Sequence, residues 1–188
     1  MSKTIITEEA FQAAALTLGC EVAAIKAVAK VEAPKGPFLE SGEPPVLFER
    51  HVFHRLTGGR WSKAHPDISN PKRGGYGKES QQHARLQRAA ALDREAALKS
   101  ASWGAFQIMG FNHEQAGHVA LQGFINAMYR DADSQLQAFV SFIKSDPRLL
   151  RSIRAKDWAA FARVYNGSAD AEHGYHTRIA AAYRDLTR

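Results

Sequence analysis

Residues 21–34, EVAAIKAVAKVEAP, combine a helical apolar repeat with a carboxylate at its end. Ile25, Val28 and Glu32 occupy positions i, i+3 and i+7 and therefore share one face of an α-helix. Pro34 disfavours helical backbone at the residue before it, so the helix ends close to Glu32. The segment predicts a buried helix whose last turn directs an acidic side chain inward.

This position predicts a raised pKa for the Glu32 carboxyl group. Burial disfavours the charged form, and the negative end of the helix dipole disfavours an anion at the C-terminus. A carboxyl group that keeps its proton near neutral pH is suited to act as a general acid. The alternative is an ordinary terminal glutamate that extends into solvent or pairs with Lys35.

Apolar residues recur at helical spacing along most of the chain, whereas the alternation typical of half-buried strands is scarce. We therefore expect an all-α, predominantly helical fold. The first helix should begin after the N-cap Thr7 and stop around Gly19, and an Ala-rich helix should cover about residues 78–99. A terminal helix is expected over about residues 171–186, with an apolar stripe of Tyr175, Ile179, Ala182, Tyr183 and Leu186 as its buried face. Three further stripes are Leu121, Phe124, Ile125 and Met128; Leu136, Phe139, Val140 and Ile143; and Trp158, Phe161, Ala162 and Tyr165.

The helical pattern is interrupted at residues 57–77, TGGRWSKAHPDISNPKRGGYG, which contain five glycines and two prolines. This composition predicts a long loop or a small β-hairpin. Loops of this length in a compact domain are more often functional than idle. No repeat or linker composition divides the chain, so we expect a single domain over residues 1–188.

The composition excludes several classes of protein. The 188 residues are 45% hydrophobic and 23% charged, which is typical of a globular domain and not of a disordered or membrane protein. Residues 1–9 lack the apolar stretch of a secretory signal, so we expect synthesis into a cytoplasm. Cys20 is the single cysteine, which excludes an intrachain disulfide and multi-cysteine metal sites.

The net charge of +6 is concentrated in two stretches. Residues 60–100 contain nine basic and four acidic residues, and residues 147–188 contain eight and four. Such an excess favours an anionic partner, which could be a nucleic acid, an acidic lipid or a cell-wall polymer. A nucleic-acid binder is disfavoured because the aromatic residues follow apolar stripes instead of alternating with basic residues.

A second candidate carboxylate is Glu49, in the segment LFERHVFHRL at residues 47–56. It aligns with Val52, Phe53 and Leu56 at the start of a predicted helix, where the dipole stabilises an anion. Two carboxyl groups whose surroundings move their pKa values apart are typical of glycosidases. The alternative is a structural acid that bonds to backbone amides or to a neighbouring arginine.

Other catalytic or metal-binding motifs are incomplete. The HEQAGH segment at residues 113–118 places its second histidine at i+5, whereas a zinc protease helix requires i+4. His51 and His54 lack a third ligand at suitable spacing. The serines at positions 62, 69 and 102 lack a nucleophile elbow. We therefore expect no metal and no cofactor.

Five segments of the chain are distinctive: AVAKVEAPKGPFL (27–39), PPVLFERHVFHRLTGGR (44–60), GGYG (74–77), SASWGAFQIMGFN (100–112) and FARVYNGS (161–168). In this order they resemble the N-acetylmuramidase catalytic domain of bacteriophage and prophage endolysins, over about residues 10–187. A more distant similarity, carried by a glutamate at a helix end, a GxxQIM-like segment and a YN pair, is to goose-type lysozymes and lytic transglycosylases.

The resemblance implies a lysozyme-like fold and cleavage of the β-1,4 bond between N-acetylmuramic acid and N-acetylglucosamine in peptidoglycan. Glu32 matches the catalytic glutamate of the family. The segment SWGAFQIM would line the cleft, with Ser102 as a helix N-cap and Gln107 as a contact to an acetamido sugar. Tyr165 and Asn166 match the YN pair that faces the acid, although a core tyrosine and a helix C-cap are the alternatives.

We therefore expect an endolysin-type muramidase with Glu32 as general acid and with Glu49, or failing that Asp67, as second carboxylate. Candidate sugar contacts are Trp103, Phe106, Gln107, Tyr165, Asn166 and, in the glycine-rich loop, Tyr76. The alternatives are a lytic transglycosylase, although Ala33 stands where those enzymes usually have serine, and a non-catalytic wall-binding module.

The expected partner is the peptidoglycan glycan strand, bound by a monomer without a separate peptidoglycan-binding domain. The basic C-terminal region is expected either to contact lipopolysaccharide or an anionic membrane surface, or to be an ordinary solvated surface. The resemblance also implies accumulation in the host cytoplasm and passage to the wall through a separate membrane pore.

Overall fold

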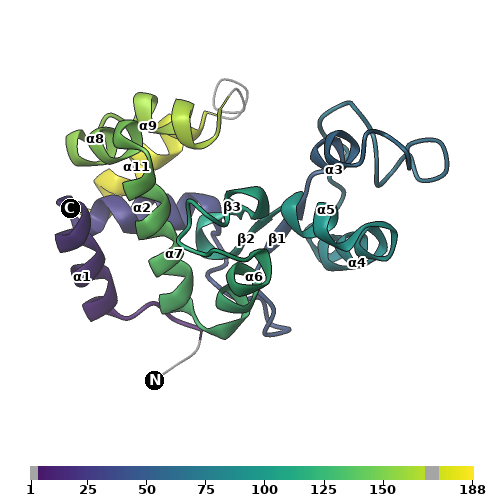
Figure 1. Cartoon of the computed structure of the whole chain (residues 1–188). Helices are drawn as coiled ribbons and strands as arrows, with labels where there is room; N and C mark the ends of the chain where they lie inside the picture. The colour runs from purple at the N-terminus through teal and green to yellow at the C-terminus, as the bar shows by residue number, and fades with distance from the viewer. Residues whose placement is uncertain (1–3, 168–173) are drawn as a thin grey trace.

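The computed structural model describes residues 4–167 and 174–188 and confirms the predominantly helical fold class (Figure 1). A small three-stranded sheet lies between two groups of helices: α3, α4 and α5 on one side, and α1, α2, α8, α9 and α11 on the other. Buried apolar side chains from both groups join in one hydrophobic cluster. The helices are α1 (Glu8–Leu18), α2 (Val22–Glu32), α3 (Arg50–Leu56), α4 (Gln82–Leu92), α5 (Arg94–Lys99), α6 (Leu121–Arg130), α7 (Ala132–Ser145), α8 (Pro147–Ala155), α9 (Trp158–Tyr165) and α11 (Tyr175–Leu186).

The helix boundaries predicted near the N-terminus are confirmed. The Thr7 side chain accepts a hydrogen bond from the Ala10 amide at 3.1 Å and caps α1. Gly19 ends that helix in the left-handed conformation, with φ of 66°. Helix α2 ends at Glu32, and its buried face includes Ile25 and Val28.

The prediction of one long helix over residues 78–99 is wrong, because the helix is interrupted at Asp93. A 3-10 turn, η1 (Glu79–Gln81), precedes α4, and Asp93 then adopts extended backbone with φ of −158°. Its side chain accepts a hydrogen bond from the Ala96 amide at 3.0 Å and caps α5. A strong N-cap residue inside an Ala-rich segment thus starts a new helix.

The sheet consists of β1 (Val46–Phe48), β2 (Ala101–Trp103) and β3 (Ile108–Met109), paired antiparallel in that order. Val46 pairs with Trp103, and Trp103 pairs with Ile108. The 3-10 turn η2 (Gly104–Phe106) connects β2 to β3, and a second, η3 (Gly110–Asn112), follows β3. The prediction that Ser102 is a helix N-cap is wrong, because Ser102 is the central residue of β2.

Residues 57–77 form a loop of consecutive turns, and no hairpin develops within it. A buried polar chain holds the loop to α3: His54 Nδ1 lies 2.7 Å from the Ser62 hydroxyl, which lies 2.9 Å from the Ser69 hydroxyl. Ser69 is completely buried. The loop is therefore anchored to the body of the protein and carries Tyr76 back toward the sheet.

The C-terminal half follows the predicted stripes. Helices α6, α7 and α9 bury most of the apolar residues that predicted them, and α8 is an additional helix. Leu121, Trp158 and Tyr165 are only partly buried. The predicted start of the last helix near residue 171 lies outside the described residues. From Tyr175 onward α11 is helical, buries Ile179 and Ala182, and packs extensively on α2. No helix in the described ranges is long and apolar enough to cross a membrane.

Candidate active site

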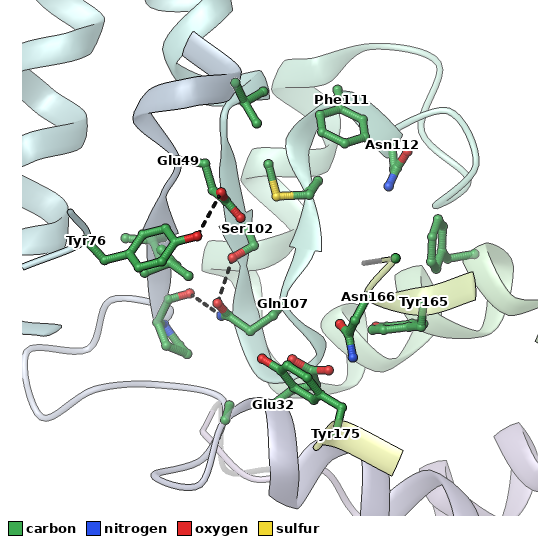
Figure 2. Close-up of a pocket in the computed structure, with 18 of the residues that line it drawn as sticks. Glu32, Glu49, Tyr76, Ser102, Gln107, Phe111, Asn112, Tyr165, Asn166 and Tyr175 are labelled. Carbon is green, nitrogen blue, oxygen red and sulfur yellow. Dashed lines mark hydrogen bonds between the residues drawn. The ribbon is translucent and has the colours of Figure 1, made fainter. Parts of the chain in front are cut away.

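A cleft of about 890 Å³ runs along the sheet. Its walls are formed by the C-terminal end of α2, the β2–β3 hairpin, the start of α3 and its following loop, the end of α9 and the start of α11 (Figure 2). Both predicted carboxylates, Glu32 and Glu49, line it, as do Tyr76, Ser102, Gln107, Tyr165 and Asn166. Segments far apart in the sequence thus meet around one groove.

Glu32 combines access to the cleft with a shielded oxygen atom. It is the last residue of α2, and its Oε1 atom is buried and has no hydrogen-bond partner. Burial raises the pKa of Glu32 to about 7, although the Asn166 amide and the Arg178 charge both act to lower it. The direction matches the expectation from the sequence. The carboxyl group is therefore suited to hold and release a proton near neutral pH.

The YN pair lies beside this carboxyl group. The Tyr165 hydroxyl donates a hydrogen bond of 2.6 Å to the Phe106 carbonyl oxygen, and the Tyr165 ring stacks on Phe161. Asn166 is the C-cap of α9, and its buried Nδ2 atom lacks a partner at hydrogen-bonding geometry. Tyr165 thus belongs to both the core and the cleft wall, and Asn166 is both a helix cap and a polar group next to Glu32.

Tyr175 is a cleft residue that the sequence reasoning assigned to the core. It is the first residue of α11, and its phenol lies next to Glu32 in Figure 2. Burial, followed by the nearby Glu32 carboxyl group, raises the pKa of Tyr175 to about 12. Its place at the start of the apolar stripe was the available signal, because a helix-terminal residue can face a groove instead of the core.

Glu49 lies at the junction of β1 and α3. Its carboxylate accepts a hydrogen bond of 3.3 Å from the Tyr76 hydroxyl, and His51 Nδ1 lies 3.0 Å from the same oxygen. Burial raises the pKa of Glu49, although Arg73 and the Tyr76 hydroxyl act to lower it.

The expectation that the helix dipole lowers the pKa of Glu49 is therefore wrong. Glu49 is the N-cap residue of α3, but its side chain makes no capping hydrogen bond. Helix α3 has only seven residues, so desolvation outweighs its dipole. The two carboxyl groups differ in the size of their pKa shifts and not in the direction.

The two carboxylates lie at opposite ends of the β2–β3 hairpin, with Gln107 between them in Figure 2. The Glu49 amide donates to the carbonyl oxygen of Ser100, directly before β2, whereas η2 at the other end of β2 packs on α2. Three residues, those of β2, lie between Ser100 and the start of η2, so the two contacts are four residue steps, roughly 13 Å of strand, apart. The two acids therefore line the same groove from different ends of β2.

Gln107 holds the hairpin turn in place. It adopts the left-handed conformation with φ of 47°. Its Nε2 atom donates to the carbonyl oxygens of Gly104 at 2.9 Å and Pro45 at 3.3 Å, and its Oε1 atom accepts from the Ser102 hydroxyl at 2.7 Å. Both the oxygen and the nitrogen of the side-chain amide are thus hydrogen-bonded within the protein. A contact between Gln107 and the substrate stays a prediction.

The structure does not bring Trp103 and Phe106 to the cleft. Each is 1% exposed, and neither lines the groove. The Trp103 indole donates to the Leu98 carbonyl oxygen, and Phe106 stacks on Phe139. The exposed aromatic side chain of this region is instead Phe111, which is 39% exposed and lies on the cleft wall.

Asp67, the second choice for the other carboxylate, is paired with Arg88 at 2.7 Å and does not line the cleft. The histidines of the HEQAGH segment lie outside regular helices: His113 is the C-cap of η3, and His118 follows the turns after it. In the described part of the chain no three His, Cys, Asp or Glu side chains converge to hold a metal ion.

Comparisons with known proteins agree with the motifs and the fold. A model of the N-acetylmuramidase family matches residues 21–187. The chain is similar to an endolysin of the Burkholderia phage AP3, known from a crystal structure, with 38% sequence identity and a TM-score of 0.86. That similarity covers 100% of this chain and 74% of the endolysin chain. Among curated proteins, none matches.

Proposed function

Since the chain belongs to the N-acetylmuramidase family, we propose that Glu32 is the general acid with which it cleaves its substrate. The protein is an endolysin-type muramidase, a glycosidase that hydrolyses the β-1,4 bond between N-acetylmuramic acid and N-acetylglucosamine in bacterial peptidoglycan. The observation that carries the proposal is the buried, unpaired Glu32 Oε1 atom, in a cleft where the pKa of this carboxyl group is about 7.

In this mechanism Glu32 donates its proton to the glycosidic oxygen as the bond to the muramic ring breaks. Positive charge then develops on that ring in an oxocarbenium-like transition state. After proton transfer the Glu32 carboxylate is stabilised by the nearby Asn166 amide and the Arg178 charge, the same groups that lower its pKa. The residues around Glu32 therefore stabilise the carboxylate that forms when the proton is transferred. They do not lower the pKa so far that Glu32 loses its proton before the substrate binds.

We propose Glu49 as the second carboxylate, which activates water or stabilises the developing charge. Its hydrogen bond from Tyr76 and its contact with His51 orient the carboxylate toward the groove. Gln107 lies between the two carboxyl groups in Figure 2, and we propose that Glu49 acts through a water molecule. Asn166, Tyr165 and Phe111 are the proposed sugar contacts, with the Phe111 ring as a stacking surface.

The decisive experiment replaces Glu32 by Gln and measures the release of reducing ends from purified sacculi. Loss of a positioned proton donor should lower the rate at least ~10²-fold. The exposed Glu9→Gln variant is the matched control and should keep the wild-type rate. Full activity of a folded Glu32→Gln protein would contradict the proposal.

Mass spectrometry of the same digests separates hydrolysis from transglycosylation. A hydrolase adds one water to each cleaved bond, whereas a lytic transglycosylase leaves an anhydro-muramic end without added water. In H₂¹⁸O a muramidase product gains the heavy oxygen at the new reducing end. Unlabelled anhydro products would identify the transglycosylase reaction.

We further propose that the protein acts as a monomer and that the basic C-terminal region contacts the anionic lipopolysaccharide surface of a Gram-negative cell. Arg184 and Arg188 are exposed on α11 and at its end. Arg178 is unsuitable as a probe of this contact, because it donates to the Val31 carbonyl oxygen at 3.2 Å beside the active site. Charge reversal at Arg184 and Arg188 should therefore weaken killing of intact cells while sparing digestion of purified sacculi. Unchanged killing would contradict the contact.

The similarity to a phage endolysin supports a cytoplasmic site of accumulation and transfer to the wall through a separate membrane pore. Fractionation of producing cells with and without a co-expressed pore protein tests this route. Lysis should require the pore, and lysis without it would contradict the proposal.

A further inference from the structure

The α3 end of the cleft carries a group of arginines to which the proposed mechanism assigns no role. Arg55, in the last turn of α3, and Arg73, in the following loop, both line the groove and are exposed. Arg50 lies close by, with its guanidinium packed against the backbone of Gly75. In the neighbouring acid, Glu49, burial raises the pKa and the charge of Arg73 acts to lower it.

Electrostatic effects show that these cations converge. Burial, followed by the charges of Arg73, Arg55 and Arg50, lowers the pKa of His51 at the floor of this region. Arg73 also acts on Glu49. Arg55 has no acidic partner among the described residues, so its guanidinium is available to a ligand.

We propose that Arg55 and Arg73 form an anion subsite that binds a carboxylate carried by the lactyl arm of the muramic acid unit. This inference rests on the proposed muramidase function. It names the chemical group of the substrate that the protein recognises. A polymer of N-acetylglucosamine alone has no carboxylate, whereas peptidoglycan carries one on the stem peptide or, where the peptide is absent, on the lactyl group itself. Guanidinium groups bind carboxylates with short, charge-assisted hydrogen bonds.

Binding measurements in the Glu32→Gln background test the subsite, because the glycan is then not consumed. Three soluble ligands are compared: peptide-bearing strands, strands stripped of peptides by an amidase, and stripped strands whose lactyl carboxyl is capped as a neutral methylamide. The variants are Arg55→Gln, Arg73→Gln and the double substitution. The matched control is Arg163→Gln, an exposed arginine of α9 outside the cleft, which changes the net charge by the same amount as each single substitution.

We expect the double substitution to raise the Kd roughly tenfold for a carboxylate-bearing strand and to leave the Kd of the capped strand unchanged. An effect limited to peptide-bearing strands assigns the carboxylate to the stem peptide, and an effect on stripped strands assigns it to the lactyl group. Arg163→Gln should change neither. An equal effect on the capped strand, or no effect on any strand, would overturn the subsite.

The catalytic assignment is tested separately on the same strands. With Glu32 intact, the Arg55→Gln variant, which keeps Arg73 beside Glu49, should cleave capped strands at the wild-type rate and require higher concentrations of the charged strands. Rapid cleavage by Glu32→Gln would refute the role of Glu32, whereas wild-type binding by the double variant would refute only the anion subsite.

Discussion

The Tyr165 hydroxyl donates a 2.6 Å hydrogen bond to the carbonyl oxygen of Phe106 and so joins the last turn of α9 to η2 across the floor of the cleft. This bond fixes Asn166, the next residue, beside Glu32. A hydrogen bond therefore connects the β2–β3 hairpin to α9 next to the proposed proton donor.

Replacing Tyr165 by Phe removes this hydrogen bond and keeps the stack on Phe161. The Phe106 carbonyl oxygen then loses its donor, which should lower the free energy of unfolding by about 1–2 kcal/mol. Denaturant unfolding measures this change, and kcat should fall because Asn166 is less well held. Tyr183→Phe, which removes an exposed hydroxyl that donates to Glu21, is the control and should have little effect on either quantity. A Tyr165→Phe protein as stable and as active as wild type would contradict this role.

The raised pKa of Glu32 predicts that the catalytic acid lowers stability at alkaline pH. Its pKa rises from an ordinary value of 4.5 to about 7 in the folded protein, so between these values the native state retains a proton that the unfolded state has lost. Stability should therefore fall as pH rises through this window and level off above it.

The Glu32→Gln variant does not titrate at this position and should escape the loss. It should match wild type near pH 4 and be more stable by up to about 3 kcal/mol at pH 8. Chemical unfolding at both pH values gives the comparison, and Glu9→Gln should follow wild type throughout. Parallel curves for wild type and Glu32→Gln would show that Glu32 does not titrate in this way.

The charge of Arg178 should set the alkaline limb of the activity profile. Arg178 lowers the pKa of Glu32, and the general acid must be protonated to act. Arg178→Met removes the positive charge, so the Glu32 proton should be lost at higher pH and the decline of kcat/KM should move to higher pH. Arg184→Met, on the same helix, removes an equal charge from a residue that does not act on Glu32 and should leave the profile unchanged. A shift of the Arg178→Met profile to lower pH would contradict the assignment.

The sequence was sufficient to predict the helices whose apolar repeat extends over two or more turns. The stripes of α6, α7 and α9, the Thr7 cap and the inward position of Glu32 all follow from spacing and capping. The sheet was missed because strands of two or three residues are too short to show an alternating pattern, and β2 is buried on both faces.

The site residues that were misplaced depend on long-range packing. Trp103 and Phe111 belong to the same SASWGAFQIMGFN segment, yet the first is buried and the second lies on the cleft wall. Only the fold of the hairpin decides between them. The pKa of Glu49 likewise depends on Arg73 and Tyr76, which lower it from a loop more than 20 residues away in the sequence.

Gly110 is the residue that allows η3 to approach α5 and thus places Phe111 on the cleft wall. A Cβ atom at this position would lie 2.1 Å from the carbonyl oxygen of Leu98, a backbone atom that cannot rotate away. Gly110→Ala should therefore lower the free energy of unfolding by about 3 kcal/mol or more, since the two elements must separate. Gly123, in α6, has no atom closer than 3.9 Å to its Cβ position, so Gly123→Ala should instead raise stability by about 0.5–1 kcal/mol through helix propensity. Denaturant unfolding should therefore give changes of opposite sign in the free energy of unfolding for Gly110→Ala and Gly123→Ala. Changes of the same sign would refute the packing of η3 against α5.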